Sequence, residues 1–134
     1  MSTIDYHTLL ARAAEARRNA YAPYSHYAVG ACLLAQNGAI FCGCNVENAS
    51  SGCTLCAERS AVARAVSEGV HAFAAIAVVG AEAGEEGGYC PPCGICRQVL
   101  AEFCEPSMPV VLLRDGAPVT IPLGDLLPHA FELK

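Results

Sequence analysis

Two Cys-x-x-Cys pairs, Cys53/Cys56 and Cys93/Cys96, are the residues of this chain best suited to bind a metal ion. Their simplest interpretation is a structural zinc site made of four cysteines. The two pairs are, however, farther apart than the roughly 15 to 20 residues that are usual in small zinc modules. We expect a helix and a strand between them, and a domain with its own core has little need of zinc for folding.

A catalytic site needs only three of these cysteines. We expect Cys56 in the first turn of one helix and Cys93 and Cys96 at the start of another. Residues three apart on a helix share a face, so both members of the second pair can reach one ion, while two helix N-termini lower the pKa of cysteines. Three protein ligands leave one position of a tetrahedral zinc open for catalysis. The sequence therefore predicts one zinc ion per chain.

Glu58 follows Cys56 by two residues, and such side chains diverge on a helix, so Glu58 cannot easily share the ion. It can instead take a proton from water held by the ion and deliver that proton to a substrate, as a catalytic acid and base. Three thiolates outweigh the charge of one Zn²⁺, so a positive side chain should hydrogen-bond to the sulfurs. Arg59 and Arg97 are the candidates, and Arg59 is favoured.

The composition indicates one domain over residues 1–134 and a substrate without strong negative charge. Only 16% of the residues are charged, against about 25% in an average domain, so subunit contacts are expected to cover part of the surface. The net charge of -5 and the absence of lysine or arginine runs argue against nucleic acid as a partner. A small neutral molecule fits this composition better.

The chain begins with a polar and then amphipathic segment and contains no apolar run of membrane length. We therefore expect a cytoplasmic protein without membrane contact. In that reducing compartment, the nine cysteines indicate metal binding or catalysis rather than disulfides. Four of them are expected to pack as small apolar side chains: Cys32, Cys42, Cys44 and Cys104.

The hydrophobic pattern predicts alternating helices and strands. Asp5 can cap the first helix, Asn37-Gly38 suits a hairpin turn, Thr54 can cap the second helix and Gly69 can end it. The expected helices are 5–19, 54–68, 94–103 and 123–127, and the expected strands are 29–35, 40–45, 74–79, 110–113 and 119–121. A loop at 81–92 leads to the third helix.

The expected fold is a three-layer α/β/α domain with a mixed sheet of about five strands. Helices that alternate with strands cover both faces of a sheet, and strand 74–79, rich in alanine and valine, should be buried on both faces. The Asp115-Gly116 turn is too short for a parallel crossover. The last strand must therefore run antiparallel to its neighbour.

Cys56-Ala57-Glu58 and Pro92-Cys93-Gly94-Ile95-Cys96 match the zinc deaminase signature in its all-cysteine version. Further segments of the chain resemble the short, homotetrameric cytidine deaminases. These segments are YAPYSHYAVGA (21–31), GCNVENAS (43–50), CAER (56–59), PCGICRQ (92–98) and LLPHAF (126–131). The resemblance covers nearly the whole chain in the right order.

The resemblance implies zinc-dependent hydrolytic deamination of free cytidine and 2′-deoxycytidine to uridine and 2′-deoxyuridine, in a homotetramer whose subunits share active sites. Asn45 and Glu47 would hydrogen-bond the ribose, and Glu47 would bind its 3′-hydroxyl. The backbone of Ala57 would help to hold the base. Tyr27, where the family commonly has phenylalanine, would pack against the base, and Phe131 would come from a neighbouring subunit.

Two positions depart from the family pattern, and three alternatives remain open. Ser51 stands where an aromatic residue is usual, and Cys53 replaces a common apolar residue. The nearest alternative is a deaminase of another small amine-bearing heterocycle, such as a blasticidin-type antibiotic. A structural zinc protein would need Cys53, and a dithiol redox protein would use Cys93 and Cys96 without bound zinc.

Overall fold

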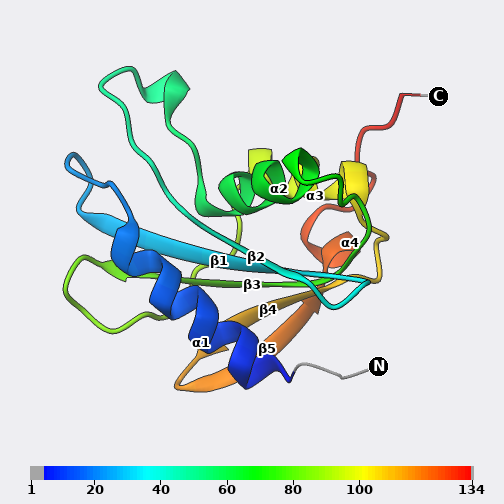
Figure 1. Ribbon diagram of the computed structural model, residues 1–134, viewed down its shortest axis with the longest axis horizontal. Coiled ribbons are helices and arrows are strands. Elements are labelled where there is room, and N and C mark those ends of the chain that lie inside the picture. The colour runs from blue at the N-terminus through cyan, green and yellow to red at the C-terminus, as the bar shows by residue number, and fades with distance from the viewer. Residues whose placement is uncertain (1–4, 134) are drawn as a thin grey trace.

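The computed structural model of the chain describes residues 5–133, and Figure 1 shows one sheet with helices on both of its faces. The strands are β1 (Tyr27–Ala35), β2 (Ile40–Cys44), β3 (Phe73–Glu82), β4 (Pro109–Arg114) and β5 (Ala117–Pro122). The helices are α1 (Tyr6–Ala16), α2 (Ala57–Ser67), α3 (Gly94–Phe103) and α4 (Leu123–Leu126), with short 3-10 turns η1 (Arg17–Asn19) and η2 (Ser51–Cys53). The order of the strands is β2-β1-β3-β4-β5.

The sheet is mixed, as predicted. β1 runs antiparallel to β2 and β3, β3 runs parallel to β4, and β5 returns antiparallel to β4. In Figure 1, α1 lies below the sheet and α2 and α3 lie above it. The expected three-layer fold with five strands is confirmed.

β3 separates the two apolar cores of the domain, because its alternate side chains point to opposite faces. Ala75, Ala77 and Val79 pack with α1, whereas Ile76 and Val78 pack in the larger core beneath α2 and α3. All five are at most 2% exposed. The prediction of a strand buried on both faces is correct.

α1 begins where the sequence predicts. The Asp5 carboxylate accepts a hydrogen bond from the Thr8 backbone N–H at 2.8 Å, which satisfies a donor that the helix itself leaves unpaired. At its other end, α1 lies so close to the sheet that a Cβ on Gly30 would be 2.0 Å from the Ala13 carbonyl oxygen. Glycine in β1 therefore sets how closely the last turn of α1 approaches the strand.

The start of α2 differs from the prediction. Thr54 was expected as the N-cap, but Cys56 occupies that position and Thr54 has extended backbone geometry. Val46 and Leu55 exchange two backbone hydrogen bonds, each 2.9 Å long. Because this pairing commits Leu55 to an extended conformation, the helix can begin only after it. Gly69 ends the helix with a positive φ of 85°, as expected.

Two of the cysteines predicted to pack as separate apolar side chains are instead joined. Cys32 and Cys42 form a disulfide between β1 and β2, where they are direct partners in the strand register. Their Cα atoms are 4.2 Å apart, close to the spacing of a non-hydrogen-bonded antiparallel pair. A hairpin centred on Asn37 brings these two positions opposite each other.

Among the described residues, no helix has the length and apolar character needed to cross a lipid bilayer. Residues 45–53, here called the arm, project from the body of the domain at the upper left of Figure 1. The arm joins β2 to the segment that precedes α2.

Candidate active site

Three sulfur atoms meet where α2 and α3 begin. Cys56 is the N-cap of α2 and Cys93 is the N-cap of α3, and both have extended backbone geometry. Cys96 lies in the first turn of α3 and is fully buried. The Sγ atom of Cys93 is 3.7 Å from that of Cys56 and 3.4 Å from that of Cys96. Two helix N-termini therefore direct their cysteines at one point.

The three sulfurs fit a tetrahedral zinc ion. Zinc bonds thiolates at about 2.3 Å, so sulfurs around one ion lie roughly 3.8 Å apart. The ligand atoms of Cys56, Cys93 and Cys96 all lie within 4.8 Å of one another, and within residues 5–133 no other group of three or more metal-binding side chains is present. Cys53 is exposed in η2 and lies outside the cluster. This arrangement suits a site with three protein ligands and disagrees with a four-cysteine structural site.

The helix N-termini were expected to lower the pKa of these thiols, and the pKa values of the two cysteines of α3 shift in opposite directions. Burial opposes ionisation of Cys93, but hydrogen bonds from the backbone and thiol of Cys96 and from Cys56 lower its pKa. Burial and the nearby Glu58 carboxylate raise the pKa of Cys96. A thiol must lose its proton to bind metal, so metal binding at this cluster is linked to proton release from Cys96.

Glu58 is a buried carboxylate beside the sulfurs. It is the second residue of α2 and is only 4% exposed. Burial raises its pKa, against the opposing effects of hydrogen bonds from its own backbone N–H and from Cys96 and of the charge of Arg59. A carboxylate held out of water without a full ion-pair partner is costly for folding, which is typical of catalytic groups.

Arg59 supplies positive charge to the cluster. Its Nη2 atom donates to the Thr54 carbonyl at 3.0 Å and lies 3.7 Å from Cys56 Sγ. The hydrogen bond to Cys56 raises the pKa of Arg59. Its Nε atom is buried and has no hydrogen-bond partner among the described residues. A guanidinium in this position offsets the charge of thiolates, so the cluster suits thiolate ligands of a cation.

Arg97 takes a different place. It donates to the Pro92 carbonyl at 2.7 Å and to the Leu126 carbonyl at 2.8 Å, and so connects the start of α3 to α4. Its neighbour Gln98 exchanges hydrogen bonds of 3.0 and 3.3 Å with the backbone of Phe131. Phe131 itself is 70% exposed. Gln98 was not singled out from the sequence, although it lies within segment 92–98.

Asn45 is bound to β1. Its Oδ1 accepts a hydrogen bond from the Val29 N–H at 2.8 Å, and its Nδ2 donates to the Tyr27 carbonyl at 2.9 Å. The side chain is 8% exposed. Asn45 thus fixes the root of the arm to the first residues of β1, and Tyr27 begins that strand.

Glu47 lies farther out on the arm and is held by the loop before β1. Its carboxylate accepts hydrogen bonds from the Tyr24 N–H at 3.0 Å, from the Ser25 N–H at 3.1 Å and from the Ser25 hydroxyl. The hydrogen bond from the Ser25 side chain lowers the pKa of Glu47. Ser25, which the sequence interpretation missed, therefore keeps this half-buried carboxylate ionised and oriented.

Tyr27 packs against Gly80 and Cys90. A Cβ on Gly80 would be 2.8 Å from Cys90 Sγ and 3.0 Å from Tyr27 Cε2, so glycine leaves room for both side chains. Burial, followed by the neighbouring Cys90, raises the pKa of Tyr27 to about 12. Ala57, fully buried, is the first residue of α2, and its N–H has no acceptor within the helix.

Comparison with known proteins agrees with this geometry. Residues 3–112 match the model of the cytidine and deoxycytidylate deaminase zinc-binding region. A cytidine deaminase of Sporosarcina psychrophila is 48% identical over 130 residues, which are 96% of this chain and 93% of that protein.

Solved structures agree as well. A cytidine deaminase from Burkholderia pseudomallei superposes with a TM-score of 0.86 at 48% identity and covers 96% of this chain and 100% of its own. One from Mycobacterium tuberculosis has a TM-score of 0.81 at 40% identity, with 98% and 100% covered. The chain belongs to the zinc-dependent cytidine and deoxycytidylate deaminase family.

Proposed function

We propose that this chain catalyses the hydrolytic deamination of free cytidine and 2′-deoxycytidine to uridine and 2′-deoxyuridine, with residues 1–134 acting as one catalytic domain. The observation that carries the proposal is the buried carboxylate of Glu58 beside the cluster of Cys56, Cys93 and Cys96. An acid and base next to a three-ligand metal site is the arrangement that activation of water requires.

A zinc ion held by the three cysteines supplies Lewis-acid activation of water at neutral pH. Glu58 accepts a proton from the attacking water and delivers it to N3 of the cytosine ring while the new C–O bond forms at C4. Glu58 then takes the proton of the resulting hydroxyl group and passes it to the amino group. The C4–N4 bond breaks, ammonia leaves, and the carbonyl of uridine remains.

The ribose contacts are proposed to come from the arm. Glu47 is half-buried and its lowered pKa keeps it ionised at neutral pH, which suits an acceptor for the 3′-hydroxyl. Asn45 lies at the base of the arm next to Tyr27, which is proposed to pack against the base. The helical N–H of Ala57 is directed away from its own helix and suits the edge of the base.

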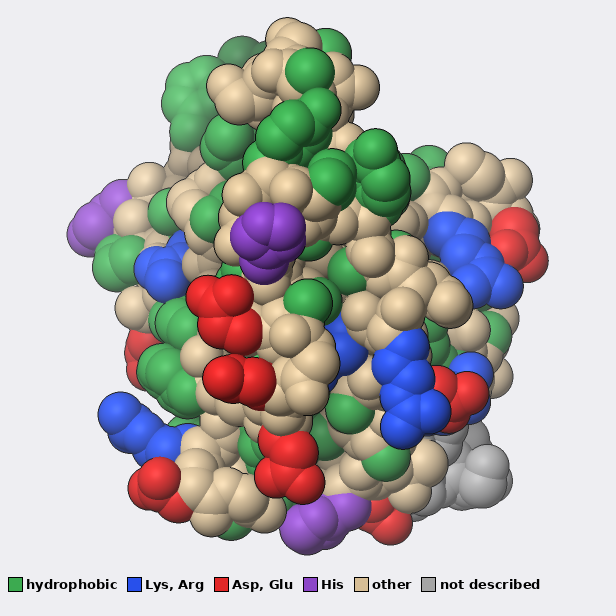
Figure 2. Space-filling model, turned by 90° about the vertical axis from the view of Figure 1, so that its left-hand side faces the viewer, with side chains coloured by type: hydrophobic (Ala, Val, Ile, Leu, Met, Phe, Trp, Pro, Cys, Tyr) green, Lys and Arg blue, Asp and Glu red, His purple; other side chains and the backbone are tan. Residues whose placement is uncertain are grey.

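We also propose that four copies form a homotetramer with shared active sites. Phe131, Tyr21 and Val46 are 70%, 57% and 43% exposed, which is unusual for large apolar side chains. Figure 2 shows apolar side chains gathered over the upper part of one face, where the arm projects. Sedimentation at assay concentration tests this assembly, and a fully active monomer would exclude it. We propose the cytoplasm as the site of action, because a reducing compartment would keep the three sulfurs available as ligands, although a disulfide such as Cys32–Cys42 is uncommon there.

The direct test is an ultraviolet absorbance assay of the purified zinc-loaded protein with cytidine. The proposal expects conversion of cytidine to uridine with release of one ammonia per turnover. Failure to convert either nucleoside, together with turnover of another aminopyrimidine, would instead support a deaminase of a different heterocycle. A single-stranded oligonucleotide tests the nucleic-acid alternative, and no turnover of it is expected.

A further inference from the structure

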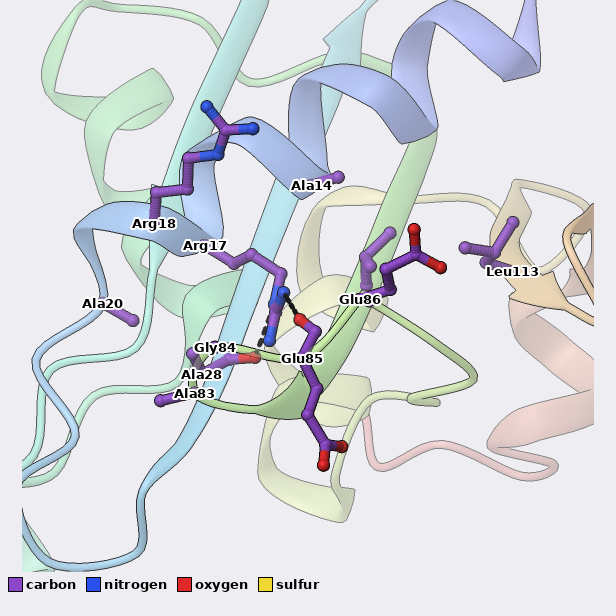
Figure 3. A pocket seen from close by; sticks show the side chains of 12 residues that line it. Ala14, Arg17, Arg18, Ala20, Ala28, Ala83, Gly84, Glu85, Glu86 and Leu113 are labelled. Carbon is purple, nitrogen blue, oxygen red and sulfur yellow. Dashed lines mark hydrogen bonds between the residues drawn. The ribbon is translucent and has the colours of Figure 1, made fainter.

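Arg17, the residue directly after α1, binds four backbone carbonyls that belong to three separate segments. Its Nε donates to Ala28 in β1 at 3.1 Å, and its Nη2 donates to Ala81 and Glu82 at the end of β3 at 3.1 Å each. Its Nη1 donates to Glu85 in the following loop at 2.7 Å. Figure 3 shows the guanidinium pointing into this loop. The rigid fork of arginine donors suits such bridging, which a lysine cannot reproduce.

The loop that Arg17 binds leads directly to Cys93 in the metal cluster. It spans residues 83–92, between the end of β3 and the N-cap of α3. Gly88 pairs with Gly80 of β3 through hydrogen bonds of 2.9 and 3.3 Å. Gly87 lies so close to the strand that a Cβ on it would be 2.1 Å from Val79 Cγ1. The backbone of the loop thus folds back onto β3 on its way to the site.

A second arginine holds the same loop from β4. The guanidinium carbon of Arg114 lies 4.8 Å from the centroid of the Tyr89 ring, a cation–π contact. The next residue, Cys90, packs over Gly80 beside Tyr27. Only two prolines, the last residues of the loop, separate Cys90 from Cys93.

Side-chain packing alone does not hold the loop on its outer side. A cavity of about 590 Å³ lies there, lined by Arg17, Gly84, Glu86 and Leu113 among others. Arg17 lies in the wall of this cavity, and its hydrogen bonds join β1 and the end of β3 to the loop there. Without them, the loop would keep the hydrogen bond from the Ala83 N–H to the His26 carbonyl at 2.7 Å, but it would lose its hydrogen bond to the residue that follows α1.

We propose that Arg17, assisted by Arg114, is a positioning residue that fixes loop 83–92 and thereby places Cys93 in the metal cluster and Cys90 against Tyr27. Its four hydrogen bonds are all with backbone carbonyls, so it acts through the loop and not on the reacting atoms. The kinetic part of this inference rests on the proposed deaminase function. The metal-binding part does not depend on it.

The test compares Arg17→Lys with Arg18→Lys in the zinc-loaded protein. Arg18 is an exposed neighbour that points away from the loop and has no hydrogen bond or ion pair with the described residues, so it is a matched control. The readouts are the rate of zinc release to a chelator at a temperature where both variants are folded, the absorption spectrum of the cobalt-substituted protein, and kcat and KM separately.

We expect Arg17→Lys to release zinc about 10 to 100 times faster than the wild type, the usual effect of residues that orient metal ligands. Its cobalt spectrum should shift, and kcat should fall more than KM rises. Arg18→Lys should match the wild type in all three. A folded Arg17→Lys protein with unchanged zinc release, spectrum and kcat would overturn the proposal, even if its Tm is lower.

Arg114→Gln is a second test of the proposal if Arg17→Lys does not fold. It removes only the contact with Tyr89 at the surface, so the domain should remain folded, and zinc release should still accelerate, by a smaller factor. Unchanged zinc release in this variant would then contradict the proposal. If the wild-type protein binds zinc but does not deaminate cytidine, the proposed function is wrong. The zinc-release comparison of Arg17→Lys would still test the positioning role of Arg17.

Discussion

Cys56 and Cys93 are 37 residues apart in the chain, yet each is the N-cap of a helix and their sulfurs lie 3.7 Å apart. Neither side chain caps its own helix with a hydrogen bond, so both are directed to each other instead. The fold thus uses two helix starts to build one metal site, and Cys96 completes it from the first turn of α3.

The two members of the first Cys-x-x-Cys pair should behave differently. Cys53→Ser should retain one zinc per chain, because Cys53 is exposed and outside the cluster, whereas Cys56→Ser should lose most of its zinc. Metal analysis of both dialysed variants measures this. Loss of zinc from Cys53→Ser would instead support a structural zinc site made of four cysteines.

Gly80→Ala should destabilise the domain by about 1 to 3 kcal/mol, the usual cost of overpacking a core, because the added Cβ would meet Cys90 Sγ at 2.8 Å. Urea unfolding of the zinc-loaded protein measures the change. Gly52→Ala is the control, since a Cβ there would meet nothing within 4 Å. Equal stability of the two variants would show that Tyr27 and Cys90 move apart freely.

Glu47 should contribute to stability in a pH-dependent way. Hydrogen bonds from Ser25 and Tyr24 hold its pKa below the ordinary value of 4.5, so its contribution is complete above that value and is lost as the pH falls through the lowered pKa. The difference in Tm between the wild type and Glu47→Gln should therefore be largest near neutral pH and shrink in acid. A difference that grows in acid would contradict the contacts of this carboxylate.

The disulfide between Cys32 and Cys42 determines how many cysteine thiols of the protein should react. Denatured, unreduced protein should titrate seven thiols, because seven cysteines are free and Cys32 and Cys42 are joined. Reduction should raise the count to nine. Nine reactive thiols before reduction would show that the two cysteines remain separate in the protein as isolated.

Much of the fold was predictable because its signals are local. Asp5 caps α1, Gly38 and Gly69 adopt the positive φ angles that end a strand and a helix, and the alternating apolar pattern gives the sheet. The spacing of the cysteines with Glu58 likewise predicted the metal cluster. Apart from the meeting of the two helix starts, these features depend on residues that are neighbours in the chain or on the same helical turn.

The features that were missed depend on distant partners. The start of α2 is set by the pairing of Val46 with Leu55, which overrides the capping tendency of Thr54. Arg17 binds carbonyls up to 68 residues away, and no residue pattern marks a backbone acceptor. The Cys32–Cys42 pair follows from the register of the predicted hairpin, but the expected reducing compartment argued against disulfides.

Glu58→Gln is the decisive variant for proton transfer by Glu58 beside a metal held by three cysteines. Glutamine keeps the size of the buried side chain, so the variant should bind one zinc per chain as the wild type does. Its kcat for cytidine should fall about 10²-fold or more, the scale of a lost acid and base group. A variant that retains zinc and turns cytidine over at nearly the wild-type rate would show that Glu58 is not the catalytic acid and base.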